Sequence, residues 1–362
     1  MRFLENLEPP AKVDRPQDVA LASAPHGSMQ EPNRSASTLR NALTLLLTSM
    51  IVLSTSCSRH HETLPVVPIV PHPGPFDFLF PIHQDQPAWS AQGLIAYYDR
   101  GVTCVLPNGS YVPDTSAAGL WVLDPSTGVK HRVSPFGEAP SWSPDGSRIA
   151  FEHNAIIYSI AADGTGLKVV AAVGRNHFPT WHPNGAWITF DSNRSGWFTI
   201  WLSKEDGTEV HQLCTGWPAE LREPNWASSG GKVALFSYLQ GVPATEIFSF
   251  DSTTCSATRL TNDERSDTDP RYSPDGRYIA FCSQGTNQWP PQIWIMKSDG
   301  SNSHQVTSAG GTWPTWSPDG SQIAYVHGDL TTGAAKQGII TILNITSGTE
   351  QQVTFHWPNT CQ

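Results

Sequence analysis

The stretch "PTWSPDGSQIAYV", residues 314–326, decides the fold class, because the chain repeats close variants of it several times. Its Ser-Pro-Asp-Gly suits a tight turn: Pro presets the first central φ, Asp accepts backbone hydrogen bonds and Gly takes a positive φ. An aromatic residue precedes this turn, and alternating apolar residues follow it, as is typical of a hairpin. The stretch therefore predicts two antiparallel strands joined by a tight turn.

Six copies of this hairpin align on their first proline, at spacings of 39 to 53 residues. The prolines are Pro87, Pro140, Pro179, Pro224, Pro270 and Pro314. Each copy continues with a third apolar strand that ends in a turn, as in "QIWIMKSDGSN", and then with a short fourth strand. Four-stranded sheets that recur at such a period predict an all-β fold, a six-bladed β-propeller with four antiparallel strands per blade.

Two other features of the repeat have a structural interpretation. The Asp-Gly pairs at 163–164, 206–207 and 299–300 predict the hairpin between strands three and four, so we interpret these aspartates as structural. A large aromatic side chain buries much area and can fill the gap between neighbouring sheets. We expect this of the aromatic residue two positions after each proline, namely Trp89, Trp142, Trp181, Trp226, Tyr272 and Trp316.

The repeat resembles the WD40-like propeller repeats of TolB-type proteins, whose consensus has the same "PxWSPDGxxIAF" and "IWxMxxDG" elements. The resemblance covers about residues 85–355, and the first and fourth copies depart from it at the turn, with "SAQG" and "ASSG". TolB itself carries an α/β domain before its propeller. We therefore expect a propeller over 85–362 and do not equate the chain with TolB.

Residues 1–57 are typical of an export segment. The apolar run 42–53 follows Arg34 and Arg40 and precedes small residues, which is the order of a secretion signal. A start at Met29 would give this signal an ordinary length. The alternative is an exposed apolar stretch in a cytosolic protein, which would be a liability.

Cys57 closes the export segment, which resembles the signals of bacterial lipoproteins, whose cysteine is lipidated after cleavage. The resemblance implies a lipid anchor at Cys57 in the periplasm or at the outer membrane. Ordinary cleavage nearby, which would leave a soluble secreted protein, is the alternative. Residues 58–84 contain many prolines, which forbid helix and favour an extended stalk, and "FDFLFPI" at 76–82 offers a possible closing strand for the last blade. Alternatively, "EQQVTF" at 350–355 completes that blade alone.

The remaining cysteines are too few and too scattered to form a disulfide framework, although export permits one or two bonds. They are Cys104, Cys214, Cys255, Cys282 and Cys361. Cys282 lies in an apolar strand, "YIAFC", and we expect it to be a small buried hydrophobe.

The composition and motifs limit the possible functions. A net charge of −10 argues against nucleic acid, because phosphates attract Lys and Arg. The chain has no Gly-x-Ser-x-Gly, His-Glu-x-x-His or Cys-x-x-Cys motif and no glycine-rich phosphate loop, so we expect no enzyme activity, cofactor or metal. One enzyme alternative remains, because some polysaccharide lyases build on this repeat and ligate a metal through histidines. His153, His177 and His327 are the candidates for such a carbohydrate-active site.

The loops favour binding. In a propeller, the loops between strands two and three and between strands four and one share a face, and here they are long and varied, which is typical of recognition surfaces. We expect a monomeric protein that binds an envelope protein or cell-wall ligand there, with a solute-binding or sensory module as a further alternative. Because strand one is innermost, residues near its start should border the central opening as a ring of charged and aromatic groups; the alternative is that the charges pair with one another and only solvate the rim. These residues are His177, Phe178, Arg222, Glu223, Asp267, Asp269, Arg271 and Trp313.

Overall fold

The computed structural model describes residues 84–99, 101–105, 111–114, 116–217, 219–239, 244–285, 290–327 and 339–354. All of these residues belong to one unit, 73–362. The export segment, the start at Met29, the anchor at Cys57 and the stalk lie outside the described residues. No helix in the described part of the chain is long and apolar enough to cross a bilayer.

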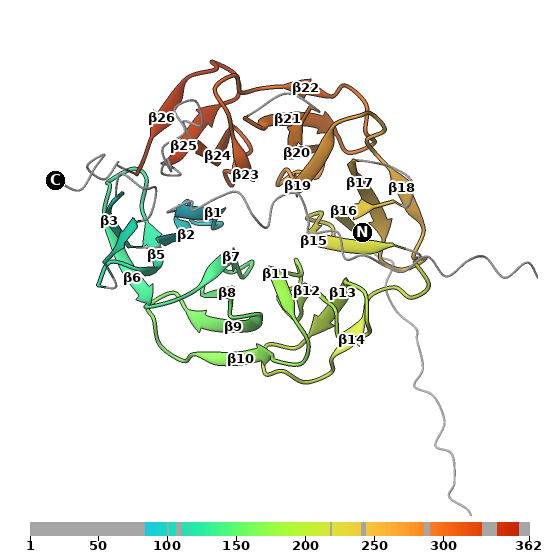
Figure 1. Cartoon of the computed structure of the whole chain (residues 1–362), viewed down its shortest axis with the longest axis horizontal. Helices are drawn as coiled ribbons and strands as arrows, with labels where there is room; N and C mark the ends of the chain where they lie inside the picture. The colour runs from blue at the N-terminus through green and yellow to red at the C-terminus, as the bar shows by residue number, and fades with distance from the viewer. Residues whose placement is uncertain are drawn as a thin grey trace, which may run out of the picture. The chain divides into compact units, whose positions relative to one another are not determined.

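The described strands form six four-stranded antiparallel sheets arranged around a centre, which confirms the six-bladed propeller (Figure 1). Blade 1 contains β1 (Gln84–Trp89), β2 (Ile95–Asp99), β5 (Gly119–Leu123) and β6 (Lys130–Ser134). Blade 2 contains β7 (Glu138–Trp142), β8 (Arg148–His153), β9 (Ile156–Ala161) and β10 (Lys168–Ala171). Blade 3 contains β11 (Asn176–Trp181), β12 (Ile188–Ser192), β13 (Thr199–Ser203) and β14 (His211–Gln212).

The other three blades follow the same order. Blade 4 contains β15 (Glu220–Trp226), β16 (Lys232–Tyr238), β17 (Thr245–Asp251) and β18 (Ala257–Arg259). Blade 5 contains β19 (Ser266–Tyr272), β20 (Tyr278–Gln284), β21 (Gln292–Lys297) and β22 (His304–Gln305). Blade 6 contains β23 (Thr312–Trp316), β24 (Gln322–His327), β25 (Ile339–Asn344) and β26 (Glu350–Gln352). A two-stranded ribbon, β3 (Val102–Val105) and β4 (Tyr111–Pro113), lies in the connection between β2 and β5.

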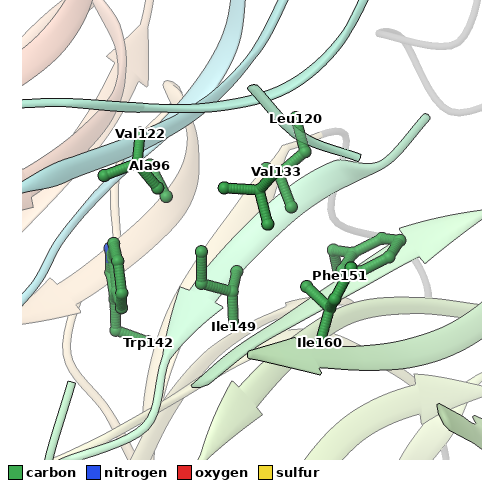
Figure 2. Close-up of a cluster of buried hydrophobic side chains, with 8 residues drawn as sticks. All are labelled: Ala96, Leu120, Val122, Val133, Trp142, Ile149, Phe151 and Ile160. Atoms are coloured by element: carbon green, nitrogen blue, oxygen red, sulfur yellow. The ribbon is translucent and has the colours of Figure 1, made fainter. Parts of the chain in front are cut away.

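The core lies between the blades, and the repeated aromatic residues fill it as predicted. Figure 2 shows one such cluster, in which Trp142 and Ile149 of blade 2 pack against Ala96 and Val122 of blade 1. The indole of Trp142 also donates from Nε1 to the carbonyl of Ala88, at 3.0 Å. The same aromatic position in four other blades is at most 8% exposed, at Trp181, Trp226, Tyr272 and Trp316.

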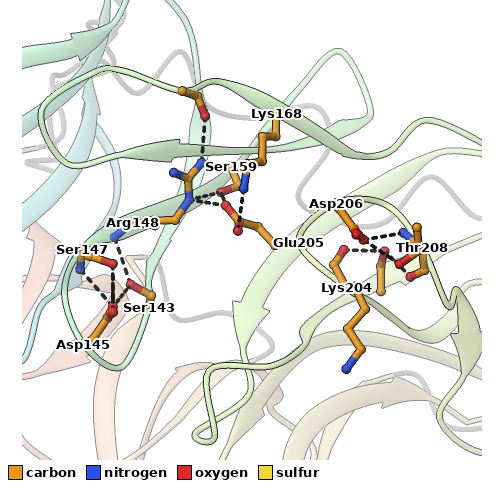
Figure 3. A network of polar contacts seen from close by, with 12 residues as sticks. Ser143, Asp145, Ser147, Arg148, Ser159, Lys168, Lys204, Glu205, Asp206 and Thr208 are labelled. Atoms are coloured by element: carbon orange, nitrogen blue, oxygen red, sulfur yellow. Dashed lines mark hydrogen bonds and ion pairs between the residues drawn. The ribbon is translucent and has the colours of Figure 1, made fainter.

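The turn aspartates are structural, as the sequence indicates. Asp145 accepts hydrogen bonds from the hydroxyls of Ser143 and Ser147 and from the backbone N–H of Ser147 (Figure 3). Asp206 holds Thr208 in the same way, through its hydroxyl and its backbone N–H. These bonds fix the turns at the ends of the hairpins.

The ring closes by packing of blade 1 against blade 6. Ile95, Tyr97 and Leu123 of blade 1 share a buried cluster with Ala324, Ile340 and Ile342 of blade 6. The backbone N–H of Trp89 also donates to Oγ1 of Thr315, at 3.4 Å. Blade 6 takes its fourth strand from β26, within the predicted segment 350–355, while segment 76–82 lies outside the described residues.

One disulfide links neighbouring blades within the described part of the chain. It joins Cys214, which follows the outer strand of blade 3, to Cys255, which lies in the β17–β18 turn of blade 4. The expectation that export permits such a bond is consistent with this finding, because disulfides persist in oxidising compartments. Cys282 is a free and buried thiol, as the sequence predicts.

We predict that this disulfide stabilises the propeller measurably. It spans a sequence separation of 41 residues, and closing a loop of this size in the unfolded chain contributes about 2–4 kcal/mol. A reducing agent should therefore lower the melting temperature of the wild-type protein. The double variant Cys214→Ser, Cys255→Ser should melt at the lower temperature with or without the reducing agent. A wild-type melting temperature that does not respond to reduction would contradict the prediction.

Candidate binding site at the propeller mouth

A backbone bulge recurs in the first strand of every blade. The residue just before each repeat proline has a φ between 48° and 55°, in the left-handed region, and the strand pairing shifts register there. These residues are Gln86, Ala139, Phe178, Glu223, Asp269 and Trp313. None of them is glycine or β-branched, and the proline that follows disfavours the right-handed helical conformation. Four of the eight residues predicted to form the mouth occupy these bulges.

The bulge of blade 3 is clamped to blade 2 by a carboxylate. Glu152 of β8 accepts a hydrogen bond from Nδ1 of His177, with 2.5 Å between Nδ1 and Oε1. Its other oxygen accepts from the backbone N–H of Phe178, the bulge residue, at 3.3 Å. Burial lowers the pKa of His177, but the bond to Glu152 and its charge outweigh burial and raise this pKa overall. The bond to Glu152 therefore favours the protonated imidazole.

The bulge of blade 4 is clamped to blade 3 in the same way. Asp191 of β12 accepts from Nε of Arg222 at 3.0 Å and from the backbone N–H of Glu223 at 3.2 Å. Asp191 is fully buried, and burial raises the pKa of its carboxyl although the charge of Arg222 opposes this. Arg222 also lies over the ring of Phe198, at 4.1 Å. A pair of this kind holds its geometry firmly, because separating the partners would leave a buried charge without a partner.

The clamp does not continue around the ring. The strand-two position that holds Glu152 and Asp191 is occupied by Phe236 in blade 4, Cys282 in blade 5 and Val326 in blade 6. Between blades 4 and 5 the bulge residues Glu223 and Asp269 are both buried instead. Burial raises the pKa of Glu223 well above its usual range, and the charge of Asp269 adds to this.

Three of the predicted mouth residues are not solvated. Glu223, Asp267 and Asp269 are 6%, 1% and 4% exposed, so these acids are buried beside the mouth and do not face solvent at its rim. The half-buried residues, which partners can reach, are His177, Phe178, Arg222, Arg271 and Trp313. The role of all eight residues in binding stays a prediction.

Sequence reasoning missed two exposed apolar side chains, one on the loop that leads into blade 3 and one on the β12–β13 loop within it. Val173 is 71% exposed and Trp197 is 52% exposed. The two loops are joined, because the backbone N–H of Arg175 donates to Oδ1 of Asn193 and the N–H of Asn193 donates to the carbonyl of Arg175. The signal available in the sequence was the tryptophan within a loop between two strands of one blade.

The first strands of the blades surround the centre of the propeller (Figure 1), and a central channel lies between them. Its cavity measures about 200 Å³ and is lined largely by the repeat prolines and by the residues on either side of them. Phe178, Arg271 and Trp313 from the predicted mouth line this cavity, together with Gln86. The mouth and the channel therefore form one continuous surface.

The three histidines of the enzyme alternative do not come together in a metal site. His153 packs on the ring of Phe136 at 4.6 Å, His177 bonds Glu152, and His327 lies 6.1 Å from the ring of Tyr325. Among the described residues, no group of three or more His, Cys, Asp and Glu could hold a metal ion.

Comparisons with known proteins agree with the fold. A family model described as TolB beta propeller domain matches residues 219–359. An uncharacterized protein of Agrobacterium fabrum is 32% identical over 200 residues, which are 53% of this chain and 66% of that protein. The Tol-Pal system protein TolB of Francisella tularensis subsp. mediasiatica is 26% identical over 255 residues, 64% of this chain. That match covers 54% of the TolB protein, so the chain spans about half the length of this relative.

A solved structure gives the same result. The structure of putative TolB from Agrobacterium tumefaciens superposes with a TM-score of 0.56 at 25% sequence identity. The superposition covers 65% of this chain and 87% of that one. The shared architecture is the propeller.

We predict that the buried acid Asp267 makes stability fall as pH rises. Burial raises its pKa from 3.8 to about 7 in the folded protein. The free energy of unfolding is therefore not reduced by this acid below about pH 4, and the protein loses stability as pH rises through 7. Asp267→Asn should flatten this dependence and raise the melting temperature at pH 8. The gain is up to about 4 kcal/mol, since one pKa unit corresponds to about 1.4 kcal/mol.

The matched control is Asp299→Asn, at an exposed turn where hydrogen bonds from Ser301 lower the pKa of the carboxyl. This control should give no stabilisation at pH 8. Thermal denaturation between pH 4 and pH 8 measures both variants, and an Asp267→Asn protein that is less stable than wild type at pH 8 would refute the prediction.

Proposed function

Because this chain carries the propeller repeats of the TolB family, we propose that it is a non-catalytic protein of the bacterial cell envelope that binds a protein partner through its mouth. The observation that carries this proposal is the clamped mouth itself. Two pairs, Glu152–His177 and Asp191–Arg222, each with a buried carboxylate, fix the first strands of blades 3 and 4 against their neighbours. A surface held in this way loses little conformational entropy when a partner binds.

The accessible groups at the mouth are of the kind that anchor protein interfaces. Phe178 and Trp313 are half-buried aromatic side chains that line the opening of the channel. Arg222 stacks on Phe198 at the same rim, and Trp197, which precedes Phe198 in the chain, is exposed. Tryptophan, other aromatic residues and arginine supply most binding energy in protein interfaces. The charged rim adds the specificity that complementary charges give.

Location in the envelope rests on two independent features. The 1–57 segment is typical of an exported protein, and Cys57 is its proposed lipid-anchoring residue. The Cys214–Cys255 disulfide fits an oxidising compartment, where such bonds persist. Mass spectrometry of the mature N-terminus tests the anchor, and an unmodified Cys57 in a soluble product would exclude it.

Site-specific photo-crosslinking tests the binding surface. A photoreactive phenylalanine analogue replaces Phe178 or Trp313 at the mouth, or Tyr278 as the control. Tyr278 is 38% exposed and follows a Ser-Pro-Asp-Gly turn, at the opposite end of the blade. In cells that export the protein, the two mouth positions should capture the same protein, and the control position should not.

Capture of one partner only from position 278, or none from either mouth position in a folded and exported protein, would contradict the proposal. Circular dichroism and the melting temperature of each purified variant establish that the propeller is intact.

A further inference from the structure

We propose that the central channel of the propeller is a binding site for a small carboxylate. This inference goes beyond the binding of a protein at the mouth, because it concerns the walls of the cavity itself. One residue per blade carries the argument, the residue between the repeat proline and the aromatic residue. All six line the cavity: Ala88, Ser141, Thr180, Asn225, Arg271 and Thr315.

The oxygen atoms of three of these side chains are already occupied as acceptors. Each receives the backbone N–H of the aromatic residue in the next blade. Oγ of Ser141 accepts from Trp181 at 3.3 Å, and Oδ1 of Asn225 accepts from Tyr272 at 2.8 Å. Oγ1 of Thr315 accepts from Trp89 at 3.4 Å. These bonds hold neighbouring blades together and fix the orientation of each side chain.

The polar groups of these side chains that remain available to the channel are hydrogen-bond donors. Asn225 keeps both N–H groups of its amide, and Ser141 and Thr315 keep their hydroxyl hydrogens. Within the described part of the chain, none of these groups donates to another residue. Two backbone carbonyls of lining residues are also occupied as acceptors. The carbonyl of Ala88 accepts from the indole of Trp142, and that of Arg271 accepts from the indole of Trp316.

Arg271 adds the positive charge. It is the one charged residue in the wall of the cavity, which contains no Asp or Glu among its described lining. Its Nη1 donates to the carbonyl of Pro270 at 2.9 Å, and it forms no ion pair with another described residue. In a protein of net charge −10, this channel is a donor-rich surface with one guanidinium, whose charge also acts on the buried Glu223.

The chemistry and size of the cavity define the class of ligand. A guanidinium presents two parallel N–H groups that match a carboxylate, and amide and hydroxyl donors complete its coordination. A cavity of about 150 Å³ holds a benzene molecule, so about 200 Å³ accommodates roughly eight non-hydrogen atoms. Proline and tryptophan rings of the wall suit a short apolar body attached to the carboxylate. The group is either a free organic acid or the carboxylate that ends a peptide chain.

Isothermal titration calorimetry of the intact propeller with succinate tests the proposal, with the neutral analogue succinamide as the ligand control. The wild-type protein should bind succinate and not succinamide. Arg271→Gln removes the charge, and Asn225→Asp replaces the free amide by a second oxygen while keeping the acceptor for Tyr272. Each variant should weaken binding at least tenfold. Lys297→Gln, which removes an exposed positive charge from β21, should bind like the wild type.

A second titration distinguishes the source of the carboxylate. It uses a short peptide with a free C-terminus and the same peptide with an amidated C-terminus. Binding of the free-ended peptide alone, lost in Arg271→Gln, supports a site for a chain end, whereas binding of succinate supports a free acid.

The proposal fails if neither succinate nor the free-ended peptide binds the folded protein. It also fails if both variants bind as tightly as the wild type, or if inorganic phosphate binds and carboxylates do not. These outcomes leave the crosslinks at the mouth unaffected, so the two proposals fail separately.

Discussion

The left-handed backbone of the residue before each repeat proline is the constraint on which the rest of the structure depends. A side chain in this conformation is strained, by about 1–3 kcal/mol, so the surrounding contacts must hold it in place. The bulge allows the residue two positions before the proline to meet the preceding blade, as His177 meets Glu152. It also leaves the residue after the proline on the wall of the channel, as with Asn225. One backbone feature thus builds both the mouth and the channel.

The contacts that hold the bulges differ around the ring. Blades 3 and 4 use carboxylates, since Glu152 and Asp191 each accept from both a side chain and the bulge backbone. In blades 4, 5 and 6 the matching position of strand two carries no carboxylate, and the packing relies on the aromatic residues and on bonds from backbone N–H groups to side-chain oxygens of the next blade. The mouth is therefore most firmly fixed beside blades 3 and 4, where His177, Phe178 and Arg222 lie.

The blade count, the hairpins and the inter-blade aromatics were all predictable, because turn chemistry and strand alternation are local properties of the sequence. Asp145 and Trp142 are examples, since their neighbours in the chain already explain their roles. The burial of Glu223, Asp267 and Asp269 was not predictable, because it depends on a register shift that alternation does not reveal. The donors in the channel could not be predicted for another reason. Ser141, Asn225 and Arg271 differ in chemistry, and only their bonds to the neighbouring blade show which of their atoms are occupied.

The stability of substitutions at Ala139 tests most directly whether the bulges are strained in the way described. Ala139 is buried, with a φ of 48°, while Ala150 is also buried, in β8, without a positive φ. Glycine relieves the strain at position 139, about 1–2 kcal/mol, against an entropy cost of about 0.5–1 kcal/mol. Ala139→Gly should thus melt at or above the wild-type temperature, while Ala139→Val and Ala150→Gly should melt below it. A loss in Ala139→Gly as large as that in Ala150→Gly would contradict the account.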